Sequence, residues 1–145
     1  MPVESETIGV MSLLSFLTKT FFGINGPGEK IEAPVTATFS YEIHVPEFAA
    51  LRASGEPFTL LDVREASELA QAKLPGAVHI PMGEITMRAN QELDPEDHII
   101  VMCHHGVRSM NVTSFLRQQG FEKAQSLAGG IDRYAREIDP SVGTY

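Results

Sequence analysis

The stretch 98–109, HIIVMCHHGVRS, decides the fold of this chain. Residues 99–102 are four apolar residues in a row, and a short apolar run of this kind predicts a strand that is buried on both faces. Residues 109–119 are amphipathic and predict a helix. The chain's one cysteine, Cys103, stands where the predicted strand ends and the loop to the helix begins. In open parallel sheets this is the end of a strand where ligands bind.

Short apolar runs alternate with amphipathic segments from residue 39 onward. This alternation predicts a parallel sheet with helices on both faces. Gly120 suits the left-handed position after the helix at 109–119, and Phe121 is expected to fold back on Leu116 in a Schellman cap. The predicted strands are 41–43, 58–61, 77–80, 98–102 and 124–127, and the predicted helices begin near 46, 65, 85, 109 and 131.

Residues 1–38 differ from the rest in their pattern of apolar and turn-forming residues. They are expected to form an N-terminal extension to a domain at 39–145. Apolar residues recur at helical spacing between Met11 and Phe21, before a turn-rich break at 23–28. We expect this segment to pack on its own domain or on a second copy of the chain, as in a homodimer. Acidic Glu4 and Glu6 precede it where a secretory signal has basic residues, which favours a cytoplasmic location.

The acidic composition limits which partners the chain can bind. The chain has 145 residues, enough for one domain, with 11 Lys and Arg against 19 Asp and Glu and a formal net charge of -8. An acidic surface disfavours nucleic acid, because phosphates are neutralised by a surplus of Lys and Arg. The same charge repels small anions at long range, so an anion site has to be built locally.

The loop at 103–109 has the features of such a local site. Gly106 allows the chain to curl so that backbone N–H groups point inward, and the following helix adds its positive end. Arg108 adds a full charge, and each of these features favours the thiolate of Cys103 over the thiol. The alternative is that Cys103 is an inert thiol of the core.

Two histidines follow Cys103 and raise the question of a metal. Adjacent residues such as His104 and His105 seldom face one ion, and no further cluster of Cys and His completes a tetrahedral site. We expect them to line the loop instead, where a protonated imidazole can stabilise a thiolate or a persulfide. No metal and no cofactor are expected.

Four motifs in order make the chain resemble the rhodanese family over about residues 39–140. They are LLDVRE at 60–65, LPGAVHIP at 74–81, CHHGVRS at 103–109 and LAGGI at 127–131. The resemblance implies a three-layer α/β/α domain with a mainly parallel five-stranded sheet, and Cys103 as the nucleophile that accepts a sulfane sulfur. It also implies that His104, His105, Gly106, Val107 and Arg108 bind substrate, and that Asp62, Arg64 and Ser109 support the site.

The chain departs from the family pattern at Glu68, where some longer relatives carry an additional anion-binding arginine. Arg108 is then expected to be the main fixed cation, while the acidic run at 65–68 is interpreted as a solvated face. Cysteine-dependent phosphatases, the competing class, place five residues between their cysteine and arginine. Only four separate Cys103 from Arg108, so this loop should fit a sulfur rather than a tetrahedral oxyanion.

The resemblance implies a thiosulfate sulfurtransferase. A small anionic donor such as thiosulfate gives its sulfane sulfur to Cys103, and the persulfide passes it to cyanide, glutathione or a protein thiol. The alternative is a sulfur-relay or binding module that acts on a protein partner with little turnover of small molecules.

Overall fold

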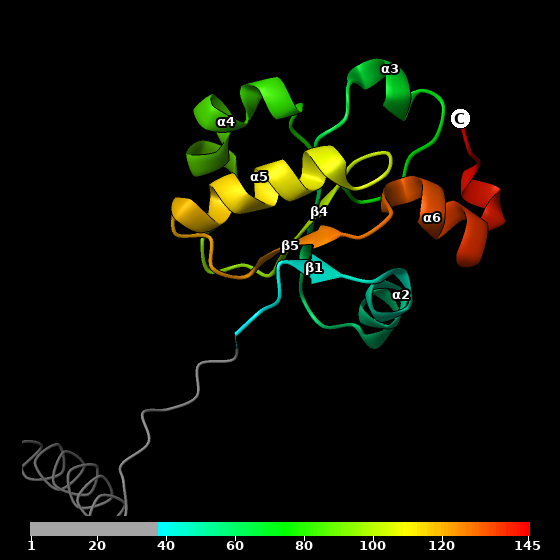
Figure 1. The fold of residues 1–145 in the computed structure, drawn as a ribbon, viewed down its shortest axis with the longest axis horizontal. Coiled ribbons are helices and arrows are strands. Elements are labelled where there is room, and N and C mark those ends of the chain that lie inside the picture. The colour runs from blue at the N-terminus through cyan, green and yellow to red at the C-terminus, as the bar shows by residue number, and fades with distance from the viewer. Residues whose placement is uncertain (1–37) are drawn as a thin grey trace, which may run out of the picture. The chain divides into compact units, whose positions relative to one another are not determined.

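The computed structural model describes residues 38–145 (Figure 1). The extension expected at 1–38 lies outside the described residues, apart from Thr38. Among the described helices, none has the length and the apolar character needed to cross a bilayer.

Five parallel strands form one sheet. They are β1 (Glu42–Ile43), β2 (Thr59–Asp62), β3 (Val78–His79), β4 (Ile99–Met102) and β5 (Ala124–Leu127). Their order across the sheet is β1-β5-β4-β2-β3, and every neighbouring pair is parallel. This confirms the five-stranded parallel sheet, and the strand that precedes Cys103 lies at its centre.

Helices cover both faces of this sheet (Figure 1). The described α-helices are α2 (Val45–Ser54), α3 (Ala66–Leu69), α4 (Ile85–Glu92), α5 (Val107–Gln118) and α6 (Gly130–Glu137), with short 3-10 helices at Met82–Glu84 and Pro140–Val142. One core cluster joins α4 and α5 to the sheet, and a second joins α2 and α6 to its other face. The three-layer α/β/α architecture is therefore confirmed.

The central strand β4 supplies side chains to both cores. Ile99 and Val101 pack in the cluster under α4 and α5, while Ile100 and Met102 pack in the cluster under α2 and α6. All four are completely buried, because successive side chains of a strand point to opposite faces and both faces are covered. The unbroken apolar run in the sequence reflects this two-sided burial.

Helix α5 ends in the predicted Schellman cap. Gly120 has a φ of 96°, and its N–H donates to the carbonyl of Arg117. The N–H of Phe121 donates to the carbonyl of Leu116 at 3.0 Å, and both side chains are buried in the same core cluster. The cap fixes the direction in which the chain enters β5.

Two helices differ in extent from the sequence-based expectation. The helix expected at 65–72 is the single turn α3, and the turn expected at 85–89 continues as α4 to Glu92. Arg88 pairs with Glu84 and with Glu92, one turn away on either side, and these contacts support the longer helix.

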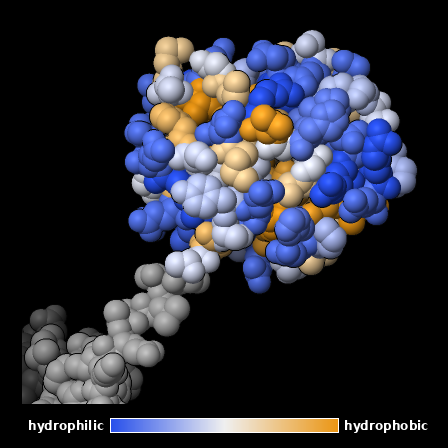
Figure 2. All heavy atoms as spheres, in the orientation of Figure 1, coloured by the Kyte–Doolittle hydropathy of each residue, from blue (hydrophilic) through white to orange (hydrophobic). Residues whose placement is uncertain are grey.

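The surface seen in Figure 2 is mostly polar, and its apolar areas are small and interrupted by polar side chains. In the described residues the exposed large apolar side chains are Tyr41, Met82, Met87, Val107 and Ile138. Of these Val107 is the most exposed, at 73%, and it belongs to the loop that follows Cys103.

The start of α6 packs against this same loop. The N–H groups of Ile131 and Asp132 donate to the carbonyls of Cys103 and His104, at 3.0 and 3.1 Å. Gly130 has a φ of 62°, and a Cβ atom built on it would lie 2.3 Å from the His104 carbonyl oxygen. Only glycine allows the two backbones to approach this closely.

Gly130→Ala is expected to lower the free energy of unfolding by about 2–4 kcal/mol, because it adds a backbone collision to the cost of a left-handed residue. Gly55→Ala is the matched control, since Gly55 also has a positive φ, of 78°, but nothing lies within 4 Å of its added Cβ. The control should lose about 1–2 kcal/mol. Urea unfolding measures both, and equal losses would contradict the close approach at Gly130.

Candidate active site

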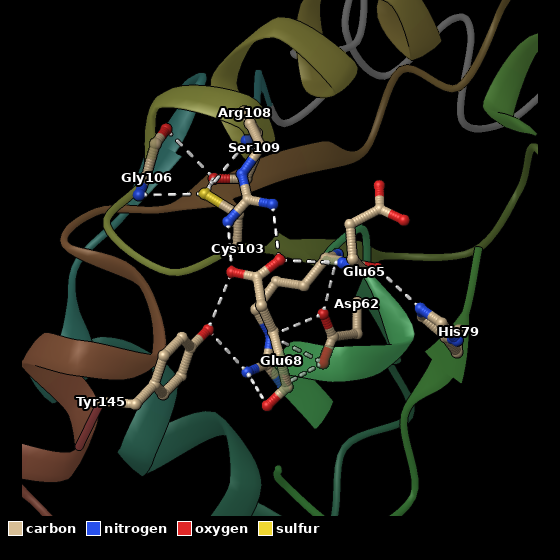
Figure 3. Close-up of polar contacts among 10 residues, drawn as sticks. Asp62, Glu65, Glu68, His79, Cys103, Gly106, Arg108, Ser109 and Tyr145 are labelled. Carbon is tan, nitrogen blue, oxygen red and sulfur yellow. Dashed lines mark hydrogen bonds and ion pairs between the residues drawn. The ribbon is translucent and has the colours of Figure 1, made fainter. Parts of the chain in front are cut away.

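Cys103 lies at the carboxyl end of β4, with 1% of the residue exposed. Its sulfur faces the loop at 104–108, and Figure 3 shows it beside Gly106 and Ser109. The backbone N–H groups of Gly106 and Ser109 donate to Sγ at 3.0 and 3.3 Å. These two donors point at the sulfur from within the loop and from the first turn of α5, where the helix dipole also favours negative charge. The loop therefore forms a cradle for a sulfur anion.

Ser109 connects the cradle to the sheet. Its hydroxyl lies 3.4 Å from Sγ, donates to the carbonyl of Gly106 at 3.1 Å, and lies 2.7 Å from the hydroxyl of Ser126 on β5. Both serines are buried. A supporting position was expected for Ser109 but not for Ser126, since nothing in the sequence of that strand marks its hydroxyl as part of the site.

Gly106 gives the loop its curvature. Its φ is 109°, a value that favours glycine, and a Cβ atom there would lie 3.2 Å from the backbone nitrogen of Gly129. The turn directs the N–H of Gly106 at the sulfur and leaves the next side chain, Val107, in solvent. Val107 therefore lies on the outer rim of the loop rather than against the sulfur.

Arg108 does not present a free guanidinium. Its Nη1 and Nη2 atoms donate to the two carboxylate oxygens of Glu68 on α3, at 2.8 and 2.7 Å (Figure 3). This bidentate contact lowers the pKa of Glu68 to about 2 and raises the pKa of Arg108 above its usual value. The interpretation of 65–68 as a solvated face is wrong for Glu68, whose side chain is only 18% exposed.

A second ion pair lies beside the first. Asp62, at the end of β2, accepts hydrogen bonds from the backbone N–H, Nε and Nη2 of Arg64, and both side chains are buried. Asp62 therefore holds both the backbone and the side chain of Arg64 in place. The remaining nitrogen of Arg64, Nη1, donates to the hydroxyl of Tyr145 at 2.9 Å, and this hydroxyl donates to Glu68 at 3.1 Å.

Tyr145 thus links the two ion pairs, which the sequence analysis did not foresee. Burial is the main reason why the pKa of this phenol lies above its usual value, so the ring is neutral near pH 7. No motif marks Tyr145, because its contacts come from residues 64 and 68, far away along the chain. Only the return of the chain after α6 brings it to the loop.

The two loop histidines are stacked. The His104 ring lies between His105, at a centroid distance of 3.8 Å, and Tyr145, at 4.0 Å. Burial and the neighbouring His105 lower the pKa of His104, so its ring is neutral near pH 7. The positive charge that the sequence analysis allowed for at this imidazole is therefore absent there at neutral pH. His105 is mostly exposed and lies 3.9 Å from the Asp132 carboxylate.

His104, His105 and Asp132 each offer a ligand atom within 4.8 Å of the others. Asp132 is already engaged by Arg136 at 2.9 Å, and the two imidazoles face each other as a stack rather than converging with their nitrogens on one point. A structural zinc site uses four ligands. Within residues 38–145 this cluster offers three, so it does not complete a structural zinc site.

Comparison with known proteins agrees with this geometry. The family model "Rhodanese-like domain" matches residues 44–137. The chain is 40% identical over 90 residues to the thiosulfate sulfurtransferase GlpE of Actinobacillus pleuropneumoniae, a match that covers 62% of this chain and 82% of GlpE. A rhodanese-related protein from Thermoplasma volcanium has a similar structure, with a TM-score of 0.62 and 27% identity over 68% of this chain and 94% of that one.

Longer proteins contain the same domain. The chain is 41% identical over 90 residues to YrkF of Bacillus subtilis, named as a candidate sulfur carrier, a match that covers 62% of this chain and 48% of YrkF. Thus the chain spans about half the length of this relative. The residues that the family model matches include β4, the cysteine loop and the glycine pair Gly129 and Gly130. The chain belongs to the rhodanese-like domain family.

Proposed function

We propose that this chain is a sulfurtransferase that carries a sulfane sulfur as a persulfide on Cys103. The observation that carries the proposal is the pair of backbone N–H groups, of Gly106 and Ser109, that donate to Sγ at 3.0 and 3.3 Å. These donors stabilise a thiolate without any metal or cofactor. The name of GlpE, a thiosulfate sulfurtransferase, supports the reaction class.

The reaction proceeds in two displacements. The Cys103 thiolate attacks the outer sulfur of a donor, a Cys103–sulfur bond forms, and the bond between that sulfur and the rest of the donor breaks with its electron pair leaving on the donor. With thiosulfate the leaving group is sulfite. An acceptor thiol or cyanide then attacks the outer sulfur of the persulfide and restores the thiolate, which gives ping-pong kinetics.

The N–H donors of the cradle stabilise the negative charge that moves in each step. When thiosulfate is the donor, negative charge lies on Sγ before the first attack and on the outer sulfur of the persulfide after it. Donors that are already oriented cost no reorganisation when this charge shifts. The Ser109 hydroxyl donates to the Gly106 carbonyl and lies 2.7 Å from the Ser126 hydroxyl, contacts that keep the backbone N–H of Ser109 directed at Sγ.

Transfer to a protein partner is the second candidate function. Val107 and His105 form the exposed rim of the loop, at 73% of the residue and 64% of the side chain respectively. An exposed rim around a buried sulfur lets a partner surface contact the loop while its own thiol enters. YrkF, a candidate sulfur carrier by name, is a relative whose name points to such an acceptor.

Cys103→Ser tests the intermediate. Incubation of the wild-type chain with a sulfane-sulfur donor should add the mass of one sulfur atom, and cyanide should remove it. The serine variant should show neither event, because it has no thiolate. Intact-mass spectrometry measures both, and circular dichroism checks that the variant is folded. Sulfur transfer at the wild-type rate by Cys103→Ser would refute the proposal.

The loop length tests the reaction class. With four residues between Cys103 and Arg108, and with Arg108 bound by Glu68, the loop should not turn over p-nitrophenyl phosphate. Release of nitrophenol is measured by absorbance, and the Cys103→Ser variant gives the background rate. Phosphate release that disappears with Cys103 would assign the chain to the phosphatases instead.

A further inference from the structure

The charges beside Cys103 cancel one another. Asp62 binds Arg64, and the hydroxyl of Tyr145 joins this pair to a second one. In the second pair Glu68 binds Arg108 (Figure 3). In the part of the chain that the structure describes, both arginines of this network are thus already engaged by carboxylates. The network carries no surplus positive charge with which to attract an anion.

Four hydrogen bonds hold the carboxylate of Glu68 in place. Oε1 accepts from Arg108 at 2.7 Å and from Tyr145 at 3.1 Å, while Oε2 accepts from Arg108 at 2.8 Å and from the backbone N–H of Glu65 at 2.9 Å. The last contact belongs to the capping box of α3, in which Glu65 and Glu68 bond each other's backbone N–H groups. Four donors fix the carboxylate, so Arg108 is freed for a ligand only when these contacts break.

Donors of sulfane sulfur differ in the charge they bring to this network. Thiosulfate is a dianion whose charge lies on or next to the reacting sulfur, and it meets a thiolate that is already negative. A protonated thiol persulfide, R–S–S–H, is neutral at its reacting end. Because Glu68 cancels the positive charge of Arg108 beside Cys103, the neutral end is the easier one to bring to the thiolate.

We propose that Glu68 is a specificity-determining residue that disfavours thiosulfate and directs the site toward thiol persulfides as sulfur donors. This inference rests on the proposed function. The Cys103 thiolate attacks the outer sulfur of R–S–S–H, the S–S bond breaks, and its electron pair leaves as R–S⁻. The outer sulfur keeps its proton, so the products are Cys103–S–S–H and the thiolate of the donor.

Glu68→Gln tests the inference with little change of shape. Glutamine also occupies this position of a capping box, so α3 should keep its first turn. Glu122→Gln is the matched control, because Glu122 is exposed, precedes β5 at the opposite end of the sheet, and changes the net charge by the same amount. Any effect of overall charge would appear in both variants.

The full-length chain and both variants are each given thiosulfate or glutathione persulfide, and the rate of sulfur addition to Cys103 is followed by intact mass. The wild type should react faster with glutathione persulfide. Glu68→Gln should react about ten-fold faster with thiosulfate and within about two-fold of wild type with the persulfide, while Glu122→Gln should match wild type with both. Tyr145→Phe, which removes one donor to Glu68, should give a smaller gain with thiosulfate.

Three other results overturn the inference. If wild type reacts as fast with thiosulfate as with glutathione persulfide, or if Glu68→Gln leaves the ratio of the two rates unchanged, then Glu68 does not set the choice of donor although the proposed function stands. If neither donor adds sulfur to Cys103 in any folded variant, the proposed function itself is wrong, and the inference falls with it.

Discussion

Two backbone hydrogen bonds, from the first turn of α6 to the carbonyls of Cys103 and His104, hold the loop on which the site depends. They require the close approach at Gly130, and they engage the two carbonyls with the start of α6. With the carbonyls engaged there, the N–H groups of Gly106 and Ser109 are left to face Sγ. The cradle is thus made by peptide orientation, and side-chain charge adds little net attraction for an anion.

The charged residues near the loop have a different role. Arg64 and Asp62 are both buried, and a buried pair of this kind contributes little net stability because both ions lose their hydration. The pair instead fixes the position of its neighbours. Arg64 also donates to the hydroxyl of Tyr145, and this hydroxyl donates to Glu68. The two ion pairs beside the cysteine loop are therefore fixed in position, and their charges cancel.

Local sequence patterns correctly predicted elements whose residues are all buried or whose contacts come from neighbours in the sequence. The four residues of β4 are buried on both sides, so their apolar run indicated the strand correctly, and the Gly120 cap needed only its neighbours in sequence. Glu68 was misinterpreted for the opposite reason. Its acidic neighbours suggested solvent, but its partners are Arg108 and Tyr145, 40 and 77 residues away, which no local pattern could pair with it.

The sequence by itself determined the parallel α/β fold, the place of Cys103 at the end of a buried strand, and the glycine that curls the loop, because each depends on the order of neighbouring residues. Only the tertiary structure decided the electrostatics of the site. It showed Arg108 neutralised by Glu68, His104 uncharged between two rings, and Ser126 beneath Ser109. The charge that a side chain presents depends on its partners and its burial, and both are set by segments that only the folded chain brings together.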